Sequence, residues 1–156
     1  MTLIKITEQA SIYENLEQKS VSEILTEINR EDRKVAQAVE KTIPEIEKLV
    51  TGIVEKMRRG GRLFYIGAGT SGRLGVLDAS EIPPTFGMPD SYVIGLIAGG
   101  DRALRNPVEA AEDDMDKGWE ELMAHKINQN DVLVGIAADG GCEYALFPCP
   151  AQCSNY

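Results

Sequence analysis

Apolar residues recur every three to four positions through much of the first third of the chain. The first nineteen residues show no such period and predict an extended or loosely packed arm. Ser20 and Glu23 have the spacing of a capping box, and an apolar stripe follows them, so we predict that a helix begins at Ser20. The polar residues at 29–31 predict a break in this helix.

Two further helices are predicted before the pattern changes. One spans 32–43, and the next begins near Thr42 and Glu45, a second pair with capping-box spacing, with Pro44 in its first turn. Gly60–Gly61 is expected to end that helix. We interpret the apolar stripes of these helices as surfaces that pack against a core or another subunit, because they carry no chemistry of their own.

Short apolar runs then alternate with helical segments. One helix is predicted over 73–81, ended by Pro83 and Pro84, and another over 104–126. The apolar runs predict three buried strands, at 62–66, 92–98 and 131–137. This alternation indicates the α/β class, with a parallel sheet flanked by helices and ligands bound at the carboxyl ends of the strands.

The residues after Ala138 show neither a helical nor a strand period. We therefore expect an N-terminal arm and helices (1–61), a partial α/β domain (62–138) and an atypical tail (139–156). A sheet of this type normally has two or more further strands, so we expect the sheet to be incomplete. Two explanations stand: a truncated or frameshifted gene product, or a short protein with a disordered tail.

Charge and composition exclude several classes of partner. The formal net charge of -9 argues against nucleic acid and anionic membranes, which both require a basic face. No apolar run reaches the roughly 20 residues of a membrane span, and the first residues lack the layout of a signal peptide, so we expect a cytoplasmic protein. The three cysteines follow no common zinc spacing and His125 lies apart from them, so we expect free thiols and no metal site.

Gly67–Gly72 formally satisfies G-x-G-x-x-G between a strand and a helix. The acidic residue that dinucleotide sites carry about 20 residues further on is missing, and no G-K-[ST] follows, which excludes a nucleotide P-loop. Two hydroxyls beside open backbone amides at a helix N-terminus suit a phosphate monoester better. A dinucleotide remains the weaker alternative, and Arg73 either adds positive charge or points to solvent. The expected phosphate-binding residues are Gly69, Thr70, Ser71 and Gly72.

Several longer motifs are specific enough to identify a family. YIGAGTSGRLGVLDASEIPPTFG (65–87), IAGGDRA (97–103), VEAAEDD (108–114) and DVLVGIAA (131–138) closely resemble the signatures of N-acetylmuramic acid 6-phosphate etherases. The resemblance covers roughly residues 5–138. It implies the sugar isomerase (SIS) fold, which this family shares with glucokinase regulatory proteins that bind sugar phosphates without catalysis.

The resemblance also implies a reaction. These etherases remove D-lactate from N-acetylmuramic acid 6-phosphate and leave N-acetylglucosamine 6-phosphate, by elimination and then hydration, in peptidoglycan recycling. They use no metal or organic cofactor, and they form homodimers with sites near the interface. By resemblance, Glu81 matches the proton-donating glutamate and Glu112 the second catalytic glutamate. We expect Glu81, placed just before the two prolines, to face the carboxyl edge of the sheet.

One turn departs from the family pattern. Where the relatives have a serine-containing A-S-G-R-T turn after the third strand, this chain has Ala138-Asp139-Gly140-Gly141. A carboxylate at Asp139 would repel a phosphate dianion. The alternative to a lyase is therefore a non-catalytic module that binds a sugar phosphate, as the regulatory relatives do.

Overall fold

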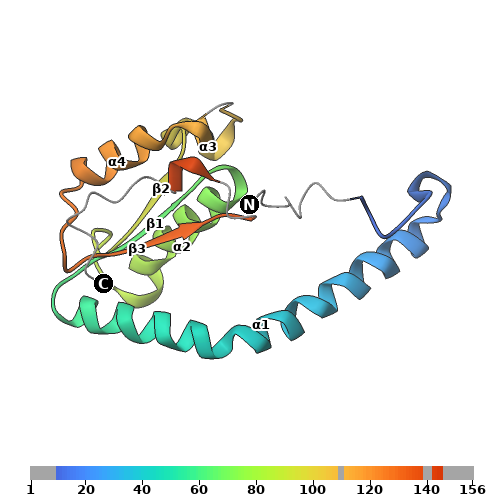
Figure 1. Cartoon of the computed structure of the whole chain (residues 1–156), viewed down its shortest axis with the longest axis horizontal. Coiled ribbons are helices and arrows are strands. Elements are labelled where there is room, and N and C mark those ends of the chain that lie inside the picture. Colours follow the sequence, from blue (N-terminus) through green and yellow to red (C-terminus); the bar gives the residue numbers. More distant parts are fainter. Residues whose placement is uncertain (1–9, 109–110, 139–141, 146–156) are drawn as a thin grey trace, which may run out of the picture. The chain divides into compact units, whose positions relative to one another are not determined.

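The computed structural model of the chain describes residues 10–108, 111–138 and 142–145 (Figure 1). The chain divides into two compact units, residues 1–52 and 53–156. Within the described ranges, no helix combines the length and the apolar character needed to span a membrane.

The first unit consists of a short arm and most of a long helix. The arm contains the 3-10 turn η2 (Leu16–Gln18), and helix α1 spans Val21–Arg58, its residues from Ile53 onward belonging to the second unit. The capping box at its start is confirmed: the Ser20 amide donates to Glu23 Oε2 at 2.8 Å, and the Glu23 amide donates to Ser20 Oγ at 3.3 Å. The arm is also tied to α1, because the Tyr13 hydroxyl donates to Glu31 Oε1.

The prediction of three separate helices is wrong. Residues 29–31 are polar but not helix-breaking, and α1 runs through them without interruption. Thr42 does not begin a helix, because its hydroxyl donates back to the carbonyl of Val39 at 2.9 Å, and Pro44 lies inside α1. Polarity alone therefore marked a solvent-facing stretch of helix rather than a boundary.

The second unit is built on a parallel sheet, and all three predicted strands are confirmed. They are β1 (Leu63–Gly67), β2 (Val93–Ile97) and β3 (Val132–Ile136), in the order β2-β1-β3. Leu63 pairs with Val93 on one side and with Val132 on the other, so the three strands begin level with one another. Since every pairing is parallel, their carboxyl ends also meet at one edge.

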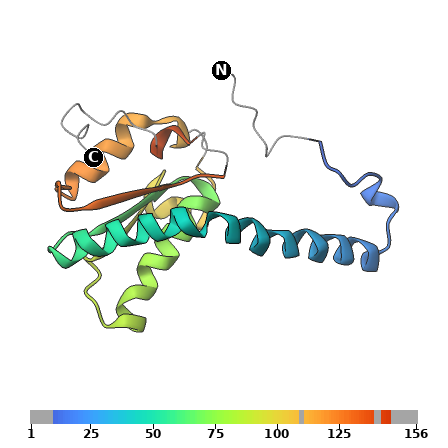
Figure 2. The ribbon, with the colours of Figure 1, turned by 60° about the horizontal axis from the view of Figure 1, so that its bottom comes forward.

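Helices cover both faces of this sheet, as expected (Figure 2). Phe64 and Ile66 of β1 point to the face covered by helix α4 (Met115–Ala124), where Leu122 completes a fully buried cluster. Leu63 points to the other face, where it packs with Ala79 of helix α2 (Gly69–Phe86) and with the last turns of α1. The two-residue period of β1 thus serves two separate cores.

Two predicted helix boundaries are wrong. Helix α2 begins at Gly69 and continues through both prolines to Phe86. A proline inside a helix lacks the donor amide but keeps its acceptor carbonyl, and the amide of Gly87 donates to the carbonyl of Pro83 at 2.9 Å. Gly87 then ends the helix in the left-handed region, at φ 65°.

The single helix predicted over 104–126 is also wrong. It is replaced by helix α3 (Gly100–Arg105), the 3-10 turn η3 (Ala111–Asp113) and α4. The break precedes Pro107, and Asn106 is extended at φ -127° and ψ 145°, as a residue before proline is expected to be.

The segment expected to be an atypical tail contains a turn and a buried side chain. Residues Glu143–Ala145 form the 3-10 turn η4, and Tyr144 is fully buried beside Phe64 and Leu122. The Tyr144 hydroxyl donates to Glu121 Oε2 at 2.5 Å. Burial is the main cause that raises the pKa of Tyr144 above its ordinary value, and this hydrogen bond is the second. One aromatic residue is enough to fill the core, but it leaves no periodic signal in the sequence.

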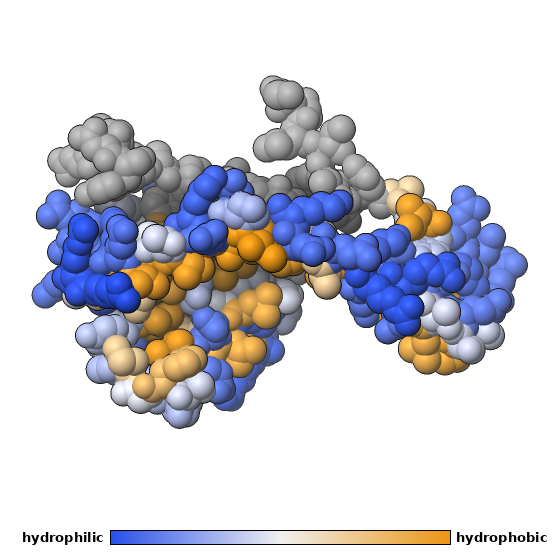
Figure 3. Space-filling view, turned by 90° about the horizontal axis from the view of Figure 1, so that it is seen from below, coloured by the Kyte–Doolittle hydropathy of each residue, from blue (hydrophilic) through white to orange (hydrophobic). Residues whose placement is uncertain are grey.

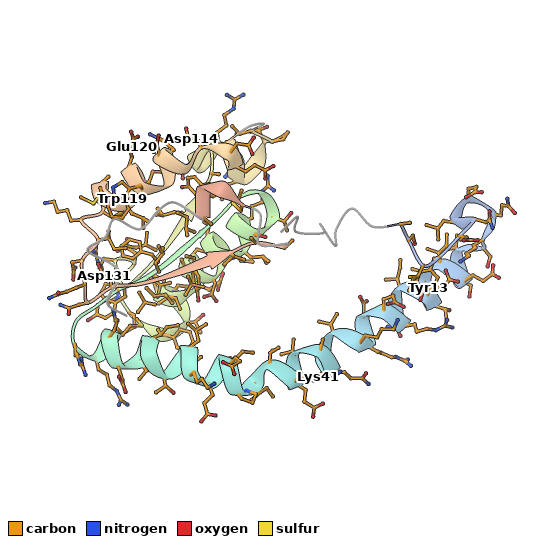
Figure 4. The ribbon with its side chains drawn as sticks, in the orientation of Figure 1. Tyr13, Lys41, Asp114, Trp119, Glu120 and Asp131 are labelled. Carbon is orange, nitrogen blue, oxygen red and sulfur yellow. The ribbon has the colours of Figure 1, made fainter. Side chains whose placement is uncertain are left out.

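Asp131 ties the amino ends of β1 and β3 together (Figure 4). Its side chain is 1% exposed and accepts hydrogen bonds from the Arg62 amide at 2.8 Å and from Arg62 Nη2 at 2.7 Å. The amide and side-chain nitrogens of Asn128 donate to the same carboxylate. Burial by itself would raise the pKa of Asp131, but the hydrogen bonds from Arg62 and Asn128 and the charge of Arg62 together hold it below its ordinary value.

Asp131→Asn should lower the free energy of unfolding by about 3 kcal/mol at pH 7, because it removes one partner of a buried ion pair. Since the folded pKa of Asp131 is depressed, its contribution is complete above the ordinary aspartate value of 3.8 and is lost as pH falls through the folded value. Urea denaturation between pH 7 and pH 2 should show that the difference in free energy of unfolding between wild type and Asp131→Asn shrinks below the ordinary aspartate value. A matched change at an exposed aspartate, Asp90→Asn, should show no such pH dependence; an equal loss in both variants would contradict the prediction.

Candidate functional site

Helix α2 begins where β1 ends and points its first amides at the carboxyl edge of the sheet. Ala68 is the N-cap residue, and no side chain caps the helix there. The first amides of a helix have no partner within it and carry the positive end of its dipole. Thr70 is exposed and Ser71 half-buried beside these amides. The expected phosphate-binding residues therefore lie together at one uncapped helix N-terminus.

Gly72 differs from the other three residues of this set. Its amide already donates to the carbonyl of Ala68 at 3.0 Å, as in an ordinary helical turn. A Cβ atom at Gly72 would lie 2.6 Å from the carbonyl oxygen of Gly67 and 2.7 Å from Ile97 Cγ1. Gly72 therefore lets α2 pack closely against the sheet. The amides of Gly69, Thr70 and Ser71 precede the Gly72–Ala68 hydrogen bond in the first turn of the helix, so they are the candidate donors to an anion.

A cavity of about 210 Å³ opens beside this N-terminus. It lies at the ends of β1 and β2, and α3 and the segment after it complete its wall. Two of its lining residues are charged, Arg73 and Glu112. The remaining lining residues are small or apolar: Ala68, Gly69, Ala98, Ala103, Pro107, Val108 and Ala111.

The Arg73 side chain packs against the protein instead of extending into solvent. Its Nε donates to the carbonyl of Leu104 in α3 at 3.2 Å, and its side chain is half-buried. This hydrogen bond restrains the side chain of Arg73, which lines the cavity together with Glu112.

The two predicted catalytic glutamates lie at different places in the second unit. Glu112 belongs to η3 and lines the cavity. Glu81 is exposed and does not line it. Twelve residues separate Glu81 from Gly69 along α2, which corresponds to a rise of about 18 Å.

The expectation that Glu81 faces the carboxyl edge is wrong. Helix α2 runs antiparallel to the strands: Gly72 lies against Gly67 at the end of β1, whereas Ala79 packs with Leu63 and Val93 at the strand starts. Glu81 follows Ala79, so it lies toward the amino edge. The prediction fails because α2 starts at the carboxyl edge and rises toward the amino edge, so a residue about three turns along it lies far from its first amides.

Other predicted features of the site fall partly outside the described residues. Asp139, expected to oppose phosphate binding, lies there, as do two of the three cysteines. Cys142 is half-buried and is a free thiol, as expected. Within the residues that the structure describes, no cluster of three or more His, Cys, Asp or Glu side chains is arranged to hold a metal ion.

The apolar wall of the cavity was not among the features predicted from the sequence. Ala98, Ala103 and Val108 come from the end of β2, from α3 and from the extended segment at Pro107. The available signal was Pro107 itself, which interrupts the predicted helix and allows the chain to turn back across the strand ends.

Comparisons with known proteins place the chain in a family. Residues 45–146 match the family model of the glucokinase regulatory protein N-terminal SIS domain. The chain is 68% identical over 146 residues to an N-acetylmuramic acid 6-phosphate etherase of Bacteroides thetaiotaomicron, covering 94% of this chain and 53% of the relative. It is 69% identical over 142 residues to the protein of the same name from Porphyromonas gingivalis, covering 91% and 52%.

A more distant relative, the N-acetylmuramic acid 6-phosphate etherase of Lactococcus lactis, is 53% identical over 132 residues, covering 85% of this chain and 44% of the relative. The chain thus spans about half the length of the curated relatives it matches. The parallel sheet, the flanking helices and the matched family model agree, and the chain belongs to the SIS family represented by the N-terminal SIS domain of the glucokinase regulatory protein.

Proposed function

We propose that the chain acts as an N-acetylmuramic acid 6-phosphate etherase, a lyase that releases D-lactate and leaves N-acetylglucosamine 6-phosphate in cytoplasmic peptidoglycan recycling. The supporting observation is an uncapped helix N-terminus that opens beside a cavity lined by Glu112. The high identity to etherases across more than nine-tenths of the chain supports the same reaction.

The phosphate of the substrate binds at the start of α2. Its oxygens accept hydrogen bonds from the amides of Gly69, Thr70 and Ser71 and from the hydroxyls of Thr70 and Ser71. Charge-assisted hydrogen bonds of this kind are among the strongest in proteins, and the helix dipole adds to them. The loop thus fixes one end of the sugar and presents the rest to the cavity.

The reaction needs one group that takes a proton and one that gives a proton. In the open-chain sugar, a base removes the proton beside the aldehyde, the electron pair forms a carbon–carbon double bond, and the bond to the lactyl oxygen breaks. An acid protonates that oxygen, and D-lactate leaves. Water then adds across the double bond, its oxygen to the carbon that carried lactate and a proton to its neighbour. Two carboxyl groups, Glu81 and Glu112, carry these transfers.

Because Glu81 and Glu112 lie toward opposite edges of one sheet, a single protomer does not bring them together. In the proposed homodimer, Glu81 reaches the cavity of the partner protomer. Leu74 and Leu77 lie two turns and one turn before Glu81 on the same side of α2, and they are 56% and 58% exposed. An apolar surface around Glu81 suits burial against a second copy. Figure 3 shows apolar side chains among polar ones on one face of the molecule.

Glu81→Gln should abolish the release of D-lactate from N-acetylmuramic acid 6-phosphate, because the amide neither gives nor takes a proton. A coupled assay for D-lactate on the purified full chain measures this. Glu120→Gln is the matched control, since Glu120 is exposed on α4 and its ion pair with Lys117 has little energetic weight (Figure 4). Turnover that survives Glu81→Gln would reject the catalytic role of Glu81, and no turnover by the wild-type chain would reject the lyase.

Mixing two inactive variants tests the shared site. If Glu81 of one protomer serves the cavity of the other, a heterodimer of Glu81→Gln and Glu112→Gln contains one intact site and one doubly altered site. Co-refolding equal amounts should restore roughly a quarter of wild-type turnover, since about half of the dimers are mixed. Turnover that stays at the level of the separate variants would reject the shared site.

The second candidate is a non-catalytic module that binds a sugar phosphate. The observation that favours it is the absence of Glu81 from the cavity that Glu112 lines, since a phosphate needs only the start of α2.

Under both candidates, Ser71→Ala should weaken the binding of N-acetylglucosamine 6-phosphate about tenfold, because a hydrogen bond to a charged group is lost. Calorimetry measures the affinity. Ser80→Ala is the control, because the Ser80 hydroxyl donates to the Leu77 carbonyl within α2, away from the cavity. Equal affinities for wild type and Ser71→Ala would remove Ser71 from the phosphate site.

A further inference from the structure

The cavity beside α2 extends beyond what a phosphate requires. Of the phosphate-binding residues, only Gly69 lines it, whereas the hydroxyl-bearing Thr70 and Ser71 do not. The rest of its wall comes from the end of β2, from α3 and from the segment around Pro107. It is therefore a chamber next to the phosphate position, with its own chemical character.

That character combines one cation, Arg73, and one carboxylate, Glu112, with an apolar wall. Arg73 is the only Lys or Arg among the lining residues, and Ala98, Ala103 and Ala111 present methyl groups. Ala98 and Ala103 are 4% exposed, so they form a fixed part of the fold. A ligand that fills this chamber therefore has a small apolar group next to an anionic one.

The hydrogen bond of Arg73 leaves part of its guanidinium group available. Nε donates to the Leu104 carbonyl, and among the described residues no acceptor is bonded to either Nη nitrogen. No ion pair joins Arg73 to Glu112, although both line the chamber. The paired Nη donors match the two oxygens of a carboxylate.

We propose that this chamber is the subsite for the lactyl group, with Arg73 binding its carboxylate and the alanine wall packing against its methyl group. The proposal rests on the proposed function, which supplies a substrate with two anionic groups. The phosphate occupies the amides at the start of α2, and the lactyl carboxylate is the second anion, which needs a second cation.

Two consequences follow for the reaction. Glu112 lines the same chamber, so it lies beside the ether oxygen that joins lactate to the sugar. The product N-acetylglucosamine 6-phosphate lacks the lactyl group and so leaves Arg73 without its anion. Arg73 is therefore a residue that distinguishes substrate from product, while the phosphate loop binds both.

The test compares the affinities of N-acetylmuramic acid 6-phosphate and N-acetylglucosamine 6-phosphate by calorimetry. All proteins carry Glu81→Gln, so that the first ligand is not consumed. Arg73→Gln should weaken the binding of the lactyl-bearing sugar about tenfold or more, because charged hydrogen bonds to the carboxylate are lost. It should leave the affinity for N-acetylglucosamine 6-phosphate unchanged. Arg102→Gln, at an exposed position of α3 that does not line the chamber, should change neither affinity.

Each other result separates the lactyl subsite from the proposed function. An equal loss for both sugars would place Arg73 at the phosphate and overturn the subsite while keeping sugar-phosphate binding. Unchanged affinity for both would also overturn it. Failure of both sugars to bind the Arg73-containing protein would overturn the proposed function itself.

A second variant separates the charge of Arg73 from its paired donors, and both variants lose the hydrogen bond from Nε to Leu104. Arg73→Lys keeps the charge but not the paired donors. Arg73→Lys should selectively weaken the binding of the lactyl-bearing sugar. The loss of affinity should be smaller than in Arg73→Gln, because lysine keeps the charge. A melting temperature equal to that of the parent protein shows that the comparison is made on folded material, and an Arg73→Lys protein with no selectivity change would contradict the proposal.

Discussion

The close contact between α2 and the end of β1 is the constraint on which the functional edge depends. No side chain separates the two elements at Gly72, where even a methyl group would lie 2.6 Å from the Gly67 carbonyl oxygen. A similar contact brings Gly95 of β2 within 2.6 Å of Val76, measured from the position its Cβ would take. These approaches fix the start of α2 directly above the strand ends. The amides of the first turn can therefore meet a ligand without a loop in between.

The sequence predicted the elements that depend on local patterns. The three strands are continuous apolar runs bounded by turns, and the reciprocal bonds of Ser20 and Glu23 need only their spacing. The sequence did not predict the elements whose limits depend on hydrogen bonds or contacts that local patterns do not indicate. Pro83 still accepts from Gly87, so α2 outlasts its prolines. Tyr144 is held in place by its hydrogen bond to Glu121 and by packing beside Phe64. The residues next to Tyr144 in the sequence indicate neither contact.

The same division applies to the site. The hydroxyls and glycines of residues 67–72 are adjacent in sequence, so their grouping at the start of a helix could be predicted from the sequence alone. The position of Arg73 beside the cavity could not, because a residue in the first turn of a helix faces solvent or a neighbour according to what packs beside it. Here the neighbour is α3, whose Leu104 carbonyl holds Nε. The chamber exists because the helix ends before Pro107 and the extended segment that follows lies across the strand ends.

Because α2 runs antiparallel to β1, the two edges of the sheet carry residues with different roles. Asp131 and Arg62 hold the amino edge, where Lys56 also donates to the carbonyl of Gln129 at 2.9 Å, and none of these groups lines the cavity. The carboxyl edge carries the free amides and the chamber. A residue twelve positions into α2 is carried away from that edge by the rise of the helix itself. Within this unit Glu81 therefore lies away from the chamber, so the proposed role of Glu81 depends on a second copy of the chain packing against the exposed leucines beside it.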